Sequence, residues 1–358
     1  MMMLIPRTET STGWQIATPI MAVLATMIAG GMLFAIMGYD PVAAIRTIFW
    51  DPLFGPAASY SRPQLLVKAG PLILIASGLA IGFRAGIWNI GAEGQYIIGG
   101  SCGAAVALAA YPGEHWWLFP AMIAAGAFGG WAWAMIPAML RNWFGASEIL
   151  VSLMLVYVAQ KVAAWMAFGP LKNPEGFGFP GSRNLQQYPS ASNPELIAGT
   201  GAHWGVFAAA LAVLATWVLM SRHIRGFHIR AAGLAPRAAR FAGVRPEVLV
   251  AFCLGLSGAL AGLAGIFEAA GPAGQITDSF GSGYGFTAII VAFLGRLNPV
   301  GILLAGLLLA LTYIGGELAQ LTMQLPAATV QVFQGMLLFF LLGFDLLTRF
   351  RITRGVPA

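Results

Sequence analysis

The sequence predicts an all-α protein, a polytopic transmembrane bundle of about ten helical spans. Only 9% of its 358 residues are charged and 58% are hydrophobic, and the mean hydropathy is +0.78. Soluble domains carry about 25% charged residues, so this chain has too little polar surface to cover a water-soluble globule. The composition therefore excludes a cytosolic enzyme, a nucleic-acid-binding protein and a disordered scaffold.

Long apolar runs predict where the helices lie. A membrane-crossing helix needs about 20 mostly apolar residues, and ten segments qualify as candidates: 17–37, 65–83, 91–111, 116–140, 148–169, 203–221, 247–270, 283–295, 299–316 and 329–348. The first is long enough to span and no small-residue cleavage site follows it, which favours a membrane helix over a removable signal peptide. The segment 283–295 is too short to cross as a plain helix. Glycines crowd its start, so we expect a broken helix there.

Basic residues near the ends of these segments predict the orientation, because Lys and Arg are retained on the cytoplasmic side. Residues 222–245 contain six arginines, and three more lie in the tail after residue 348. Four candidate spans separate the two clusters, so both fall on one side, and counting backwards places the N-terminus there too. We expect cytoplasmic termini, a cytoplasmic loop at 222–245 and external loops at 38–64 and 170–202. Together they form a single transmembrane domain over residues 1–358.

The chain lacks the patterns of an enzyme or an ATPase. Residues 99–103 fit Gly-x-Ser-x-Gly, but a hydrolase needs that motif at a strand–turn–helix junction and here it lies in an apolar helix. Ser257 lies in a Gly-Leu-Ser-Gly sequence like that of intramembrane proteases, yet all four histidines lie in loops or at span ends. No Gly-Lys dipeptide is present, so there is no phosphate-binding Walker loop. We expect no enzymatic activity and no metal site, with Cys102 and Cys253 packed as small apolar side chains.

Glycines repeat at a spacing of four inside several apolar runs. The pairs are Gly82/Gly86, Gly126/Gly130 and Gly258/Gly262. Small residues at this spacing let membrane helices approach closely. They favour a compact, many-helix bundle.

The segment from Asn89 to Gln95 places polar side chains where a span opens after a glycine-rich turn. Charged groups in or near a membrane span are unfavourable and are candidates for function by default. Glu93 also lies near a helix N-terminus, where the helix dipole stabilises a carboxylate. Both a capping role and a functional role are therefore open for Glu93.

Asn89-Ile90-Gly91-Ala92-Glu93-Gly94-Gln95 resembles the Asn-Ile-Gly-x-Glu-Gly-Gln signature of permease subunits in ATP-binding-cassette (ABC) importers. The nucleoside and simple-sugar type, served by basic-membrane-protein-like binding proteins, is the most similar group, and the branched-chain amino acid permeases are more distant. Three further segments resemble the family in order: 145–155, 233–243 and 283–301. The resemblance extends from about residue 65 to 348. Trp88 and Ala92 depart from the residues common in relatives, which leaves the ligand open.

The resemblance implies a permease subunit in the plasma (inner) membrane of a prokaryote. It would form the translocation pathway for a nucleoside or simple sugar. Separate ATPase subunits would hold ATP and Mg²⁺, so this chain would bind no cofactor. Other implied partners are an external substrate-binding protein, the lipid bilayer and a second permease chain; the long N-terminal region favours a heterodimer, and no nucleic acid is expected. The implied ATPase-coupling residues are Gly233, Leu234, Ala235, Pro236, Arg237, Ala238, Ala239 and Arg240.

A polar solute needs polar or aromatic side chains along its route through the bundle. The candidates for this pathway are Trp88, Asn89, Glu93, Gln95, Ser147, Glu148, Ser152, Tyr284, Phe286 and Asn298. Two alternatives remain: a branched-chain amino acid permease of the same architecture, and an ion-coupled secondary transporter. The second would need coupling charges at mid-membrane depth, and the middles of most spans lack charges.

Overall fold

The computed structural model describes residues 2–6, 12–176, 178–196, 199–281 and 283–354. Its internal contacts divide the chain into two compact units, Pro63–Ala310 and a unit formed by Met1–Arg62 with Leu311–Ala358. Helices dominate both units, and the strands among the described residues are β1 (Met2–Pro6) and β2 (Phe350–Arg354). The predicted all-α class is confirmed apart from this short strand pair.

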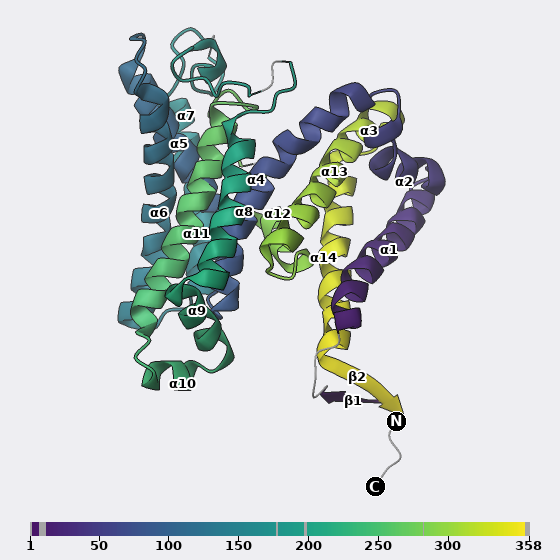
Figure 1. Cartoon of the computed structure of the whole chain (residues 1–358). Helices are drawn as coiled ribbons and strands as arrows, with labels where there is room; N and C mark the ends of the chain where they lie inside the picture. Colours follow the sequence, from purple (N-terminus) through teal and green to yellow (C-terminus); the bar gives the residue numbers. More distant parts are fainter. Residues whose placement is uncertain (1, 7–11, 177, 197–198, 282, 355–358) are drawn as a thin grey trace. The chain divides into compact units, whose positions relative to one another are not determined.

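The unit formed by the two ends of the chain is built around two long helices. It contains α1 (Thr12–Ile36), α2 (Pro41–Phe49), α3 (Asp51–Phe54), the start of α4 (Ala58–Arg84), the end of α13 (Pro299–Met323) and α14 (Ala327–Arg349). α1 and α14 lie side by side (Figure 1), with Phe34 stacked on Phe333 at 6.4 Å between ring centroids. β1 and β2 pair antiparallel, from Met2 opposite Arg354 to Pro6 opposite Phe350. The two terminal strands therefore lie at the same end of this unit.

The predicted external loop 38–64 contains α2, α3 and the start of α4. Asp40 caps α2 by accepting a hydrogen bond from the Val42 amide at 2.9 Å, and Pro41 occupies the first helical position. The nine residues of α2 bury Ile48 in an apolar cluster with Phe34. Helix α4 begins at Ala58, seven residues before the predicted start at 65. Short helices with one apolar face give no apolar run of about 20 residues, so a search for spanning segments does not resolve them.

The second unit holds the remaining helices. These are most of α4, then α5 (Ala92–Ala110), α6 (Leu118–Phe144), α7 (Glu148–Phe168), α8 (Trp204–Arg222), α9 (Ile224–Leu234), α10 (Pro236–Phe241), α11 (Pro246–Ala269), α12 (Tyr284–Leu294) and the start of α13, together with a single 3₁₀ turn, η1 (Leu185–Gln187). α5, α6 and α11 pack against one another at its centre. The pairs Gly126/Gly130 and Gly258/Gly262 meet where α6 crosses α11. A side chain at Gly130, Gly258 or Gly262 would collide with the backbone of the facing helix. Gly86 differs, because it follows the end of α4 with a φ of +73° and so serves the turn.

A helix occupies each of the ten predicted segments. Among the described residues, eight helices are long and apolar enough to cross a membrane: α1, α4, α6, α7, α8, α11, α13 and α14. α5 has 19 residues but carries Glu93 and Gln95 in its first turn. α12 has only 11 residues and starts after Gly283, whose φ of +79° breaks the chain direction there.

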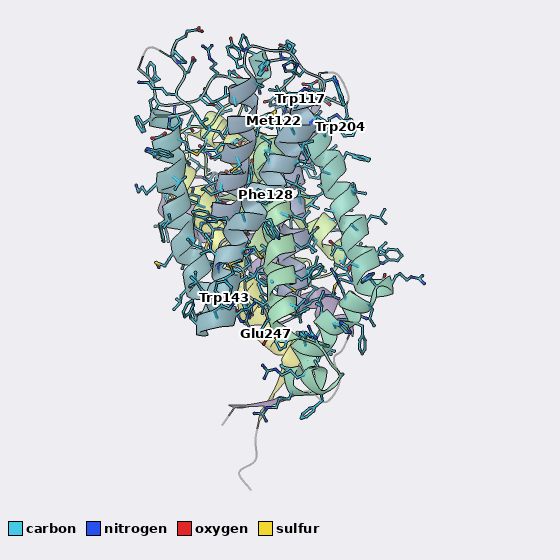
Figure 2. The ribbon with its side chains drawn as sticks, turned by 90° about the vertical axis from the view of Figure 1, so that its left-hand side faces the viewer. Trp117, Met122, Phe128, Trp143, Trp204 and Glu247 are labelled. Atoms are coloured by element: carbon cyan, nitrogen blue, oxygen red, sulfur yellow. The ribbon has the colours of Figure 1, made fainter. Side chains whose placement is uncertain are left out.

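The two ends of this second unit carry different sequence regions. α9 and α10 lie at one end (Figure 1), where Gly233 packs against the Arg84 carbonyl. At the other end, the described residues of 170–202 (170–176, 178–196 and 199–202) form a mostly irregular cap in which the Tyr188 hydroxyl donates to the Gly113 carbonyl. Residues predicted to be cytoplasmic and external therefore fall at opposite ends. Figure 2 shows Trp117 and Trp204 near one end and Trp143 near the other, as expected for tryptophans at two membrane interfaces.

Candidate functional site

The turn between α4 and α5, residues 87–91, is called the signature turn below. Asn89 in this turn is 2% exposed and donates to the Gln95 Oε1 at 2.8 Å and to the Ser257 Oγ at 3.0 Å. Its Oδ1 accepts from the Gln95 Nε2 and from the Gly91 amide, both at 3.1 Å. An asparagine side chain has two donor hydrogens and two acceptor lone pairs, so Asn89 is fully satisfied inside the protein. This network ties the signature turn to α5 and α11.

Helix α7 holds the same turn from another side. The Ser152 Oγ accepts from the Ile90 amide at 3.2 Å, and the Glu148 Oε1 accepts from the Trp88 amide at 3.4 Å. Glu148 also pairs with Arg141, with 2.5 Å between Oε1 and Nη1. This ion pair connects the last turn of α6 to the first turn of α7. The polar residues at the starts of α5 and α7 thus act together.

Glu93 contacts the broken segment predicted at 283–295. Its two carboxylate oxygens accept hydrogen bonds from the amides of Gly283, at 2.8 Å, and Gly285, at 2.6 Å. These amides open α12, and Glu93 is 1% exposed. The carboxylate therefore accepts from two backbone amides that have no partner within the helix, and its charge lies at the positive dipole end of a helix that starts inside the bundle. A side chain at position 285 would collide with the Glu93 backbone, so glycine is required there.

The aromatic candidates fall into two groups. Trp88 is 38% exposed and its ring lies 5.0 Å from that of Phe83 and 5.7 Å from that of Phe293. Phe286 is also partly exposed, at 39%. Tyr284 is instead buried, with its ring edge-on to Tyr96. Trp88 and Phe286 therefore present open ring surface, whereas Tyr284 belongs to the core.

The remaining polar candidates separate in the same way. Ser147 and Asn298 are exposed, and the Asn298 Oδ1 accepts from the Val300 amide at 3.0 Å at the start of α13. The buried candidates, all hydrogen-bonded within the protein, are Asn89, Glu93, Gln95, Glu148 and Ser152. The structure thus assigns the buried group a scaffolding position around two helix starts. That any of the ten lines a solute route stays a prediction.

Residues 233–240, the coupling segment, join the end of α9 to α10. Pro236 occupies the first position of α10, as the sequence predicts. Gly233 lies so close to the Arg84 carbonyl that a side chain would not fit, which fixes the segment against the end of α4. Leu234, near the start of the segment, is 87% exposed. Phe241, which directly follows the segment, is 94% exposed. Both large apolar side chains are therefore exposed at the end of the unit that carries α9 and α10 (Figure 1).

Beside the contact with the end of α4, a cavity of about 310 Å³ lies between the coupling segment and the bundle. Its lining includes Ile87 of the signature turn, Arg141 of the ion pair, and Pro236 and Arg240 of the coupling segment. The two elements that the sequence singled out therefore share one cavity wall.

Two polar residues have hydrogen-bonding roles that the sequence does not predict. The Gly-Leu-Ser-Gly sequence suggests only a protease nucleophile for Ser257. In the structure its Oγ accepts a hydrogen bond from Asn89. His203, at the external end of α8, accepts through Nδ1 from the Gly205 amide at 3.0 Å and contacts the Asn193 amide group at 2.9 Å. Burial lowers the pKa of His203 to about 4.

Within the described parts of the chain, no cluster of three or more His, Cys, Asp or Glu side chains has metal-binding geometry. Both cysteines are unpaired thiols; Cys253 is buried in α11 and Cys102 is partly buried in α5. Their packing role agrees with the sequence prediction.

The long apolar helices and the glycine-mediated packing between them are those of a multi-pass membrane protein. The chain belongs to the family described as branched-chain amino acid transport system / permease component, which it matches over residues 62–342. It is 34% identical to a glucose ABC transporter permease protein of Haloferax volcanii, over 97% of this chain and 92% of the relative. No solved structure matches the chain.

Two further relatives cover most of the chain. One is a guanosine ABC transporter permease protein of Bacillus subtilis, 28% identical over 90% of this chain and 91% of the relative. The other is a nucleoside ABC transporter permease protein of Lactococcus lactis subsp. cremoris, 25% identical over 91% of this chain and 90% of the relative. The predicted family is confirmed, and with it the role of a permease subunit of an ABC importer in the plasma membrane.

Proposed function

We propose that this chain is one of two permease subunits of an ABC importer that moves a nucleoside or a simple sugar into the cell. The observation that carries this proposal is the similarity over nearly the whole chain to permeases named for glucose, guanosine and nucleosides. ATP and Mg²⁺ are bound by separate ATPase subunits, because this sequence contains no phosphate-binding loop. An external binding protein delivers the solute.

The coupling segment receives the ATPase subunit. Its exposed Leu234 and the neighbouring Phe241 supply apolar anchors, and Arg237 and Arg240 are exposed cations between them. Apolar anchors rimmed by arginines are typical of protein–protein interaction sites. The cavity behind the segment then lets ATPase closure move the starts of α5 and α7.

The solute route passes the partly exposed rings of Trp88 and Phe286. Aromatic faces stack on nucleobases and on the apolar faces of sugars. The amide network around Asn89 is internally satisfied, so in this role it sets the shape of the route and does not bind the solute directly.

Ten spans and cytoplasmic termini complete the proposed topology. The eight apolar helices are joined by α5 and by α12, which enters the bundle only partway and is capped by Glu93. The arginine-rich α9–α10 end is cytoplasmic by the charge rule. The paired terminal strands agree with termini on one shared side.

We also propose a heterodimeric pore, and the N-terminal helices support it. α1, α2 and α3 precede residue 62, where the family match begins. These helices lie outside the matched family region, which supports a permease chain distinct from its partner. Co-expression of tagged and untagged copies tests this: a heterodimer leaves the untagged copy of this chain behind, whereas a homodimer recovers it.

The function is tested in proteoliposomes that contain the complete transporter: this chain, its partner permease, the ATPase and the binding protein. We expect saturable uptake of radiolabelled guanosine or glucose that stops when ATP is depleted and continues when a protonophore is added. Uptake with the opposite sensitivity would point to ion coupling and refute the proposal. Uptake of leucine in preference to both solutes would support the branched-chain amino acid alternative suggested by the family's description.

The role of the coupling segment is tested with Phe241→Ala. Phe227→Ala is a matched control, because Phe227 is also exposed, at 56%, and lies in α9 outside the segment. We expect Phe241→Ala to lower capture of the ATPase subunit about tenfold, as for an interface anchor, and the control to leave it near the wild-type level. Equal capture by both variants would place the ATPase contact elsewhere.

A further inference from the structure

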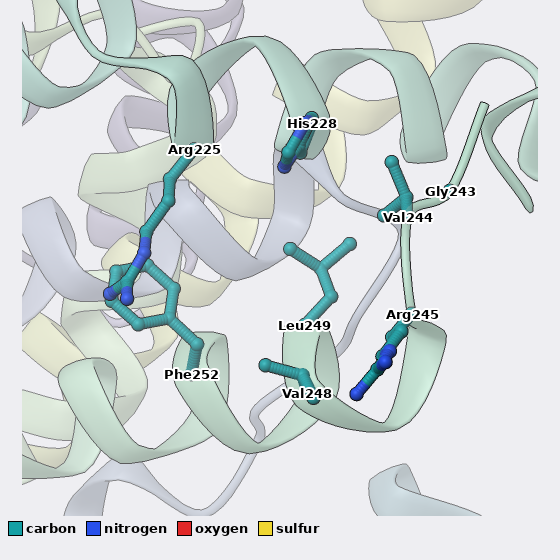
Figure 3. Close-up of a pocket in the computed structure, with 8 residues that line it drawn as sticks. All are labelled: Arg225, His228, Gly243, Val244, Arg245, Val248, Leu249 and Phe252. Atoms are coloured by element: carbon teal, nitrogen blue, oxygen red, sulfur yellow. The ribbon is translucent and has the colours of Figure 1, made fainter.

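A second cavity lies at the same end of the unit, on the side of α9 that faces α11. It has a volume of about 340 Å³ and is shown in Figure 3. Arg225 and His228 contribute from α9, and Val248, Leu249 and Phe252 contribute from the first turns of α11. The turn at residues 243–245 closes it, with Gly243 at a φ of +85°. Leu234 and Phe241 of the proposed ATPase contact are not part of its lining.

The rim of this cavity is cationic. Arg225, His228 and Arg245 are its charged or titratable residues, and none of the described lining residues is acidic. The Arg225 guanidinium lies over the Phe252 ring, 4.8 Å from its centroid, which fixes the guanidinium while leaving N–H donors at its edge. Within the parts of the chain that the structure describes, no ion pair joins Arg225 or Arg245 to a carboxylate. The cavity therefore presents uncompensated donors suited to an anion.

One wall of the cavity is apolar and continues along a spanning helix. Val248 is 60% exposed and Phe252 is partly exposed, four residues apart on the same face of α11. α11 is among the helices that qualify to cross the membrane, and it begins only two residues before Val248. Arg245 precedes it and makes no side-chain cap, so the positive end of the helix dipole also faces this region. The cavity thus joins a cationic rim at the helix end to an apolar surface in the acyl-chain region.

We propose that this cavity binds an anionic phospholipid. The headgroup phosphate lies against Arg225, His228 and Arg245, and the first carbons of an acyl chain lie along Val248 and Phe252. A free phosphate would use the rim and leave the apolar wall unoccupied, while a protein partner would bury the exposed anchors of the coupling segment. The bound lipid connects α9 to α11 and so stiffens the junction between the coupling segment and the bundle.

The proposal is tested by native mass spectrometry of the purified transporter in a zwitterionic detergent. Dioleoyl phosphatidylglycerol is compared with dioleoyl phosphatidylcholine, for the wild type and for Arg225→Gln, Arg245→Gln and Arg222→Gln. Arg222 is the matched control, an exposed arginine at the end of α8 outside the cavity. We expect retained phosphatidylglycerol on the wild type, about tenfold less on each cavity variant, and near wild-type retention on the control. The thermal stability of each variant without lipid checks that it is folded.

Three outcomes would overturn the proposal. An equal loss for all three variants would mean general surface attraction. Displacement of the lipid by millimolar inorganic phosphate, or by sn-glycerol 3-phosphate, would identify a free anion as the ligand. Unchanged lipid retention together with lost ATPase capture in the cavity variants would assign the cavity to protein docking.

Discussion

The contact between Glu93 and the start of α12 is open to a single substitution, Glu93→Gln. In the wild type the carboxylate accepts two hydrogen bonds, from the Gly283 amide at 2.8 Å and the Gly285 amide at 2.6 Å. A hydrogen bond to a charged group contributes about 1.5–3 kcal/mol. Glutamine keeps one oxygen acceptor and turns its NH₂ group toward the other amide, so one bond is lost and the second loses its charge. We expect the start of α12 to be destabilised by about 2–3 kcal/mol.

This loss is measured as amide hydrogen exchange at residues 283–287 in the detergent-solubilised transporter. Because about 1.4 kcal/mol corresponds to a factor of ten, local opening becomes about 30- to 150-fold more frequent and exchange accelerates by that factor. Solute uptake falls with it if α12 belongs to the moving part.

The matched control is Glu247→Gln. Glu247 also lies in the first turn of a spanning helix, but it is exposed and its carboxylate makes no hydrogen bond among the described residues. Its helix-dipole interaction is about 0.5 kcal/mol, so exchange at the start of α11 should change about two- to threefold. If exchange at 283–287 in Glu93→Gln rises no more than this, the capping role assigned to Glu93 is refuted.

Three further predictions concern other contacts. Gly233→Ala forces the coupling segment away from the α4 carbonyl that it touches. Stimulation of ATP hydrolysis by solute should therefore drop at least about tenfold. Gly335→Ala, at a glycine with open space around it, should have no effect. A double-mutant cycle with Arg141→Gln and Glu148→Gln should give a coupling energy of about 1 kcal/mol in thermal unfolding, since the pair is partly solvent-exposed; strict additivity would contradict the pair. His203 has a native pKa near 4, below the value of about 6.5 in an unfolded chain. As the pH falls, the locally opened form therefore binds the proton first. The free energy of opening the external cap should decrease by up to about 3 kcal/mol between about pH 6.5 and pH 4. Hydrogen exchange around His203, corrected for intrinsic rates, checks this, and a flat profile, or the same profile in His203→Gln, would contradict it.

Local patterns predicted much of this fold. Each apolar run became a helix, and Pro236 opened α10, because hydropathy and proline geometry act over a few residues. The spacing of Gly126/Gly130 and of Gly258/Gly262 also predicted close helix packing, and the structure brings these two pairs together.

Contacts between distant residues were not predictable in this way. Glu93 meets amides 190 and 192 residues away, and Asn89 meets Ser257 across 168 residues. No spacing rule encodes such partners, so the choice between a cap and a functional carboxylate stayed open until the structure supplied the neighbours. α2 and α9 differ for another reason: both are short and amphipathic, so neither forms an apolar run of spanning length.

The glycine contacts at the centre of the second unit limit how it can move. Gly99 of α5 and Gly130 of α6 both reach the backbone of α11 near Gly262. No layer of deformable side chains separates these backbones, so the helices cannot slide along one another. Shear is thereby removed from the available motions, and rotation about hinges remains. We therefore expect the three helices to move as one rigid body, with bending concentrated in the turns that join them to their neighbours.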